Sequence, residues 1–220
     1  MPLFRLDASI QAERSVSRRL ADAAEEAWRE RHSDATVIRR DLAQSPVPPG
    51  AWQAMIAARF AAGDEPGDEP GDDQGQALRL SAELAGELVA ADAYLLALPL
   101  YNWGVSQHVK AWIDMIMADP RIAMSGERLL AGRPASLIVT RGGGYGEGTP
   151  RHGWDHATPY YRRIFGDVLG LDLHVNEVEL TLAEVTPAME PLRERARELF
   201  EAGLILAGEH GTLLAKAMAA

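Results

Sequence analysis

The chain has 220 residues, 47% of them hydrophobic, and a formal net charge of −10. A chain of this length can bury a full core, so we expect a single domain spanning residues 1–220. Six of the ten net negative charges lie within 61–78, a segment without Lys or Arg. So acidic a chain lacks the basic surface that nucleic-acid binding requires, and no nucleic-acid partner is expected.

Two further features of the composition limit the chemistry. The sequence contains no Cys, which excludes disulfides, thiolate nucleophiles and Cys-ligated metal clusters. Redox chemistry therefore requires a bound cofactor. The sequence also has no run of about 18 apolar residues, and Asp7, Glu13 and several arginines stand near its N-terminus. These features predict a cytoplasmic protein without a membrane partner.

Apolar stretches alternate with amphipathic ones along the chain. Strands are predicted at 3–7, 36–38, 93–98, 135–140 and 173–180, with 39–42 leaving the second strand. Helices are predicted at about 17–32, 50–60, 76–90, 105–117, 157–169 and 187–206. This alternation predicts an α/β three-layer sandwich around a mostly parallel sheet of five strands. In such a fold, ligands bind at the carboxyl ends of the strands.

The segment 63–75 repeats Gly, Pro and acidic residues in a tetrapeptide pattern. It has too little apolar surface to offset the entropy of ordering, so we predict a flexible acidic surface loop. A tail that binds a partner is the alternative.

The loop after the first predicted strand contains Ser9, Ser15 and Ser17 and leads into a helix. Hydroxyls and amide groups at a helix N-terminus form a site for an anion such as one phosphate. The loop lacks the glycine patterns that bind dinucleotides or nucleoside triphosphates. Simple capping of the helix by Ser15 or Ser17 is the alternative interpretation.

Two other loops follow predicted strands. Residues 99–104 read Pro-Leu-Tyr-Asn-Trp-Gly and offer flat apolar walls beside amide donors, which suits a heteroaromatic ring, although these aromatic side chains would equally pack on the core. Residues 140–146 read Thr-Arg-Gly-Gly-Gly-Tyr-Gly, and consecutive glycines let the backbone approach a ligand closely, although a bare flexible loop has the same composition. Because all three loops follow strands of one sheet, we expect them to form one site.

The serines of the first loop, the run 99–103 followed by Lys110 and Asp114, and the run 140–143 resemble the FMN-dependent NADH azoreductase and NADH:quinone oxidoreductase family, which has the flavodoxin-like fold. The resemblance extends from Leu3 to about Thr181. It implies that the FMN phosphate is bound by Ser9, Ser15, Val16 and Ser17. It further implies that Pro99, Leu100, Tyr101, Asn102 and Trp103 surround the flavin ring, that Thr140, Arg141, Gly142 and Gly143 line its other polar edge, and that Tyr145 lies on its substrate side.

The same resemblance implies a homodimer with both flavin sites at the subunit interface. It also implies a ping-pong reaction in which NADH or NADPH reduces bound FMN and a quinone, azo or other aromatic compound then takes the electrons. The acidic segment 63–75 looks like an insertion relative to the family. Residues 165–167 read Phe-Gly-Asp where the family has an aromatic-containing stretch.

Two other functions fit these observations. One is a biosynthetic flavin reductase that acts on a specific aromatic metabolite, which the altered 145–167 region would permit. The other is a non-catalytic flavodoxin-like electron carrier. No metal site is predicted, because His152 and His156 are four residues apart without a carboxylate at ligand spacing. Tyr145 or Tyr101 is the expected proton donor to a reduced acceptor, unless solvent supplies the proton.

Overall fold

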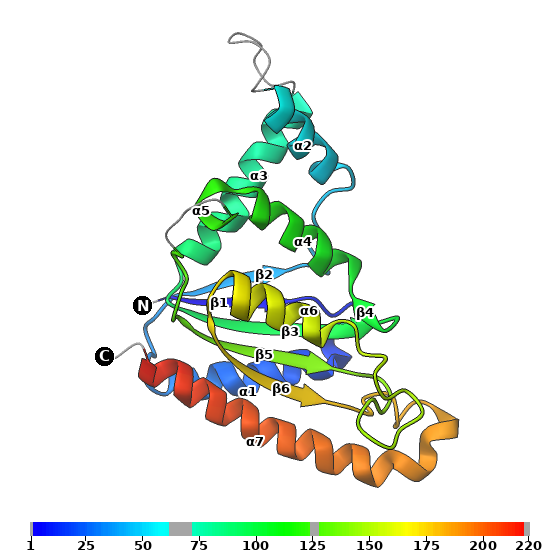
Figure 1. Cartoon of the computed structure of the whole chain (residues 1–220). Helices are drawn as coiled ribbons and strands as arrows, with labels where there is room; N and C mark the ends of the chain where they lie inside the picture. The colour runs from blue at the N-terminus through cyan, green and yellow to red at the C-terminus, as the bar shows by residue number, and fades with distance from the viewer. Residues whose placement is uncertain (1, 62–71, 124–127, 218–220) are drawn as a thin grey trace.

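The protein is built around a parallel sheet, shown in Figure 1 for the computed structural model, which describes residues 2–61, 72–123 and 128–217. The strand order is β2-β1-β3-β5-β6, and the order reverses between β1 and β3. This arrangement confirms the predicted flavodoxin-like α/β sandwich with five parallel strands. The five strands are β1 (Leu3–Asp7), β2 (Val37–Asp41), β3 (Ala93–Tyr101), β5 (Pro134–Thr140) and β6 (Asp172–Val178).

Helices cover both faces of the sheet, so the protein has three layers (Figure 1). Alternate residues of β3 point to opposite faces: Leu95 packs with α1 and α7, whereas Leu96 packs with α3 and α4. Burial on both faces explains the continuous apolar sequence of this strand. The helices are α1 (Val16–Arg29), α2 (Ala51–Ala61), α3 (Asp72–Val89), α4 (Gln107–Ala118), α5 (Pro120–Ala123), α6 (Thr158–Tyr161) and α7 (Arg193–Ala217).

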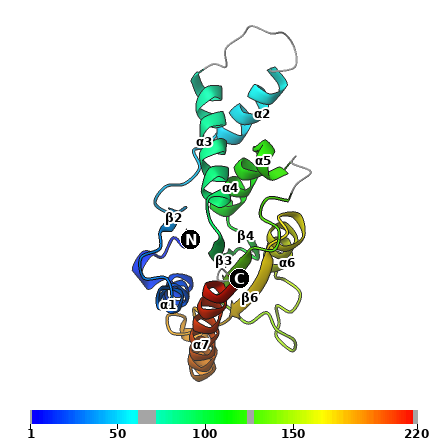
Figure 2. The same ribbon diagram turned by 90° about the vertical axis from the view of Figure 1, so that its left-hand side faces the viewer.

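The α2 and α3 helices pack against each other and extend beyond the sheet as an arm (Figure 2). Helix α3 begins at Asp72, so residues 72–75 are helical, and this part of the predicted flexible loop is wrong. Asp72 and Asp73 occupy the first helical turn, where acidic side chains interact favourably with the helix dipole. The rest of the predicted loop, up to residue 71, lies outside the described residues.

Two other segments differ from the sequence prediction. The second strand continues through Arg39 and Arg40 because an edge strand tolerates charged side chains that pair with neighbouring helices. Residue Val105 begins no helix but belongs to a short antiparallel strand, β4 (Gly104–Val105), paired with the end of β3. The remaining helical segments are the 3₁₀ helices η1 (Ala12–Arg14) and η3 (Pro187–Leu192) and the π-helical segment η2 (Arg162–Val168).

Within the described residues, the helices are too short or too polar to span a lipid bilayer.

Candidate functional site

The three predicted loops meet at the carboxyl end of the sheet. The β1 strand pairs with β3 and β3 pairs with β5, so the residues that follow these strands are neighbours in space. This is the edge where the strand order reverses, which is the usual ligand position in an open α/β sheet. Residues Pro99–Tyr101 belong to β3 itself and only Asn102 and Trp103 form its turn, so the predicted loop at 99–104 is shorter than expected.

The first loop is held closed by its own hydroxyl groups. Ser15 is the N-cap of α1, and its Oγ accepts a hydrogen bond of 3.3 Å from the amide of Arg18. Ser9 Oγ accepts a bond of 3.3 Å from the Gln11 amide. The Tyr101 hydroxyl accepts a bond of 3.2 Å from the Ile10 amide, which fastens this loop to the end of β3. Capping and anion binding therefore involve the same side chains, and neither role excludes the other.

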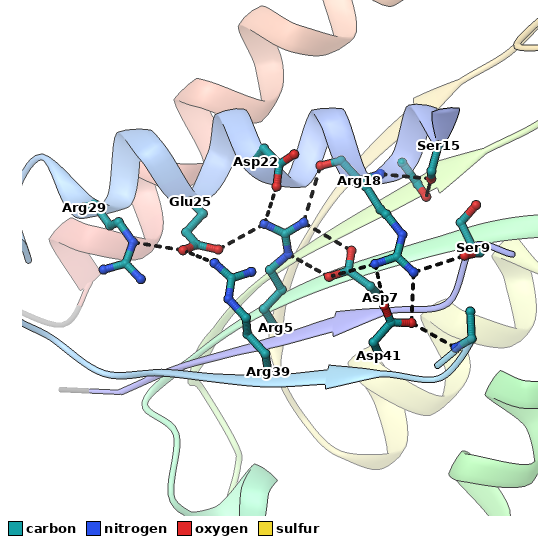
Figure 3. Close-up of polar contacts among 12 residues, drawn as sticks. Arg5, Asp7, Ser9, Ser15, Arg18, Asp22, Glu25, Arg29, Arg39 and Asp41 are labelled. Carbon is teal, nitrogen blue, oxygen red and sulfur yellow. Dashed lines mark hydrogen bonds and ion pairs between the residues drawn. The ribbon is translucent and has the colours of Figure 1, made fainter. Parts of the chain in front are cut away.

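A network of ion pairs between α1 and the strands β1 and β2 stabilises this loop (Figure 3). The Arg18 guanidinium donates a bond of 3.1 Å to the carbonyl oxygen of Ser9 and one of 2.9 Å to Asp41 Oδ1. Burial raises the pKa of the Asp41 carboxyl, but hydrogen bonds from Arg18 and the Ala43 amide outweigh burial and leave the pKa below its usual value. The network contains four arginines and four carboxylates: Arg5, Arg18, Arg29, Arg39, Asp7, Asp22, Glu25 and Asp41.

Because these charges balance, the four arginines of this network already have carboxylate partners. A ligand anion at the loop would meet hydroxyl groups and the amide groups of the first turn of α1, which have no partner within the helix. Such a set of donors suits a phosphate monoester.

The turn between β3 and β4 has an unusual backbone. Asn102 and Trp103 have φ values of 47° and 63°, so two successive residues other than Gly lie in the left-handed region. Asn tolerates this conformation, whereas a bulky residue such as Trp is strained in it. The Trp103 side chain lies at the surface, where it is 44% exposed and packs edge-on against Trp154 at 5.8 Å between centroids. Strained residues of this kind concentrate at functional sites.

In the third loop, Arg141 forms ion pairs within the protein, whereas Gly142 and Tyr145 pack closely against their neighbours. The Arg141 guanidinium points away from the loop surface and pairs with Asp155 at 2.7 Å and with Glu179 at 3.4 Å. It serves to hold the loop together. The Tyr145 ring is 8% exposed, and its amide donates a bond of 3.0 Å to Glu179. Gly142 approaches its surroundings so closely that a Cβ there would lie 2.6 Å from Leu182 Cδ1.

Two adjoining cavities occupy the space between the loops. The smaller, of about 80 Å³, is lined by five hydroxyl-bearing residues together with Gln11, Gly142 and apolar side chains. The larger, of about 870 Å³, has aromatic walls. They share Leu100, Tyr101, Gly142 and Leu182. A ligand with one phosphate and one flat conjugated ring fits this pair of cavities.

Most of the predicted site residues line these cavities. Ser9, Ser15, Val16, Pro99, Leu100, Tyr101, Thr140 and Gly142 line the smaller cavity. Leu100, Tyr101, Asn102, Trp103, Gly142, Gly143 and Tyr145 line the larger one. Ser17 and Arg141 line neither: Ser17 is 1% exposed and lies 3.1 Å from Ser15 Oγ, and Arg141 is bound to carboxylates.

Sequence analysis missed several other contributors. Leu182 and Thr181 come from the loop after β6, and Ile10, Arg151 and His108 also line the cavities. The position of Leu182 just after the last strand was the available signal, because that loop also lies at the carboxyl edge. Among the described residues, no group of three or more His, Asp or Glu side chains is placed to hold a metal ion.

Comparisons with known proteins agree with this geometry. A family model described as "flavodoxin-like fold" matches residues 1–200. A protein of Frankia alni named FMN-dependent NADH:quinone oxidoreductase is 39% identical over 207 residues, which are 92% of this chain and 96% of the relative. A protein of Kineococcus radiotolerans with the same name is 39% identical over 212 residues, 94% of this chain and 96% of the relative.

Solved structures share the fold at lower sequence identity. An azoreductase from Bacillus anthracis superposes with a TM-score of 0.75 at 22% identity and covers 96% of this chain and 99% of its own. An NAD(P)H:quinone oxidoreductase from Methanothermobacter marburgensis superposes with a TM-score of 0.64 at 19% identity, covering 97% of this chain and 96% of its own.

Proposed function

This chain belongs to the FMN-dependent NADH:quinone oxidoreductases of the flavodoxin-like fold, and we propose that it passes electrons from NADH to quinones or azo compounds by a ping-pong mechanism. It is an FMN-dependent oxidoreductase. When bound, FMN would supply the redox chemistry between a reduced nicotinamide and an acceptor. The protein supplies binding, orientation and exclusion of water.

The observation that carries this proposal is the direct connection between the hydroxyl-lined cavity and the larger aromatic cavity. Ser9, Ser15 and the amide of Val16 hold the phosphate, because they lie at the N-terminus of α1 and line the small cavity. The larger cavity is the site for the flavin ring. It is bordered by the predicted residues Leu100, Tyr101, Asn102, Trp103, Gly142 and Gly143, while Pro99 and Thr140 line the smaller cavity.

Three residues of the predicted set contribute indirectly. Ser17 holds Ser15 in place through the 3.1 Å contact between their Oγ atoms. Arg141 stabilises the loop that carries Gly142 through its ion pairs. The Tyr101 hydroxyl accepts a hydrogen bond of 3.2 Å from the Ile10 amide, which fastens the first loop to the end of β3.

Tyr145 is the residue that we assign to the substrate side. Tyr145 lines the larger cavity, where a planar acceptor would stack. The Tyr145 hydroxyl is the candidate donor of a proton to that acceptor. The nicotinamide donor and the aromatic acceptor bind alternately in this one cavity, because its flat walls suit the ring of either. This sharing is the physical reason for a ping-pong mechanism.

The proposal includes a homodimer in the cytoplasm, where NADH and NADPH are available as donors. Exposed apolar side chains surround the cavity, including Ile10 at 64%, Trp154 at 50% and Leu182 at 40% exposure. Contact with a second copy would cover them and enclose the site. Sedimentation of the FMN-loaded protein tests the dimer directly.

The reaction is tested by steady-state kinetics of the FMN-loaded protein with NADH and 1,4-benzoquinone. We expect parallel double-reciprocal lines, because the two substrates use one site alternately. Intersecting lines would contradict the shared site. If neither quinones nor azo dyes are reduced with NADH or NADPH, while single electrons pass readily from a protein donor, the electron-carrier function replaces this one. Reduction of one aromatic metabolite alone would indicate a biosynthetic flavin reductase.

A further inference from the structure

The larger cavity is basic although the chain as a whole is acidic. Three side chains that are basic, His108, Lys110 and Arg151, lie among the described residues that line it, and none of those residues is Asp or Glu. The complete chain has a net charge of −10. The positive character is therefore local to this cavity.

Among these side chains, Arg151 alone has an unpaired permanent charge. Lys110 forms an ion pair with Asp114 one helical turn away on α4. Arg151 is exposed, and none of the described carboxylates lies within ion-pair distance of its guanidinium. The contrast with Arg141 is direct, because that arginine, ten residues earlier in the same loop, pairs with Asp155, Glu177 and Glu179.

The Arg151 guanidinium lies close to the backbone of Gly143 at the cavity wall. A Cβ atom at Gly143 would lie 2.6 Å from Arg151 Nη1 and 3.9 Å from Tyr145 Cε2. The guanidinium thus lies over Gly143 next to the Tyr145 ring. Because Gly143 has no side chain, the guanidinium has room at this point of the cavity wall, on the side where we assign the planar acceptor.

We propose that Arg151 forms an anion-binding subsite at the mouth of the larger cavity. Its guanidinium binds an oxyanion, such as phosphate, carboxylate or sulfonate, on a substrate whose flat part stacks in the cavity. The planar fork of donors matches two oxygens of such a group. This inference rests on the proposed function. Two sources supply the oxyanion: the pyrophosphate of the nicotinamide donor and an acidic substituent on the aromatic acceptor.

The experiment measures kcat/KM for matched anionic and uncharged substrates with FMN-loaded wild type and Arg151→Gln. The donors are NADH and 1-methyl-1,4-dihydronicotinamide, which lacks phosphate. The acceptors are anthraquinone-2-sulfonate and 1,4-benzoquinone. We expect the ratio of anionic to uncharged kcat/KM to fall about tenfold in Arg151→Gln, as the loss of a charge-assisted hydrogen bond predicts. A fall in the donor ratio identifies the pyrophosphate, and a fall in the acceptor ratio identifies the acidic substituent.

Two controls separate this effect from other consequences of losing a charge. Arg151→Lys keeps the charge and should recover part of the ratio. Arg79→Gln removes an exposed arginine of α3 outside the cavity and should leave both ratios unchanged. Calorimetric titration with anthraquinone-2-sulfonate, without turnover, should show the same loss of affinity in Arg151→Gln.

The inference is overturned if both ratios are the same in wild type and Arg151→Gln. It is also overturned if Arg151→Gln changes the FMN dissociation constant or midpoint potential while both ratios stay constant, since the side chain would then act on the cofactor. Wild-type protein that reduces no quinone with any donor would contradict the proposed function instead.

Discussion

Arg18 and Asp41 form an ion pair with two contacts, 2.9 Å from Nη2 to Oδ1 and 2.7 Å from Nη1 to Oδ2. The pair joins the first turn of α1 to the end of the edge strand β2. The same Nη2 atom donates a bond to the carbonyl of Ser9 at 3.1 Å, so the pair also fixes the loop that we assign to the phosphate (Figure 3).

Replacing Arg18 by Met should therefore weaken both the fold and the phosphate loop. Asp41 would be left partly buried without its partner, and we expect a loss of about 1–3 kcal/mol in the free energy of unfolding. The dissociation constant should rise for FMN but little for riboflavin, which has no phosphate. Urea unfolding and fluorescence titration measure the two effects. Arg18→Lys is the control, since it keeps the charge without the two-pronged contact, and an equal loss for FMN and riboflavin would contradict the assigned role.

Substitutions of Ser15 separate its capping role from its role in ligand binding. Ser15→Ala removes the N-cap of α1 and should cost about 1 kcal/mol in the free energy of unfolding. Ser15→Asp retains a capping oxygen but places a negative charge beside the phosphate. We expect Ser15→Asp to be more stable than Ser15→Ala and yet to bind FMN more weakly. Unchanged FMN affinity in Ser15→Asp would exclude a phosphate at this position.

Trp103 is predicted to contribute to turnover more than to stability. Trp103→Gly relieves the left-handed backbone at φ 63° while removing a wall of the larger cavity. The thermal midpoint should stay constant or rise, and kcat/KM for 1,4-benzoquinone should fall at least about fivefold, corresponding to an aromatic contact of ~1 kcal/mol. Trp52→Ala is the matched control, because Trp52 is similarly exposed, at 42%, on α2. A comparable loss of turnover in that variant would contradict a specific role for Trp103.

The free energy of unfolding should decrease as the pH falls below about 4. Burial raises the pKa of the carboxyl groups of Glu25, Asp41, Asp119 and Asp155, but hydrogen bonds from their partners outweigh burial and lower each pKa. The unfolded chain therefore binds these protons at higher pH than the folded chain. The resulting stabilisation is complete above the unfolded pKa of about 4 and is lost as pH falls through the lower folded values.

Urea unfolding across the pH range measures this dependence. Arg18→Met should reduce the acid-linked loss, because Asp41 loses the partner that lowers its pKa most and keeps only the bonds from the Ala43 and Gln44 amides. A second, smaller decline should begin near pH 6.5, because burial, and to a lesser extent His174, lowers the pKa of His210, so that the unfolded chain is protonated first. His210→Gln should remove only this second decline. Stability that increases on acidification would contradict both assignments.

The sequence by itself determined the layers of the fold and the edge that carries the site. Parallel strands buried on both faces require continuous apolar runs, which is why the buried part of β3 was located correctly. The carboxyl ends of such strands must share one edge, so three separate loops could be assigned to one site before the structure was known. Edge strand β2 extended further than expected because its stability comes from charged partners on α1 and α3 rather than from an apolar pattern.

Only the tertiary structure decided what each polar side chain of those loops does. Arg141 and Arg151 belong to one loop, and the family resemblance implied that Arg141 lies along the polar edge of the flavin. The direction of each guanidinium depends on partners distant in the chain: Glu177 and Glu179 draw Arg141 inward, whereas Gly143 leaves space for Arg151 at the cavity wall. Trp154 packs on Trp103 across 51 residues for the same reason. Such contacts follow from how the loops are brought together, and no local pattern of residues encodes them.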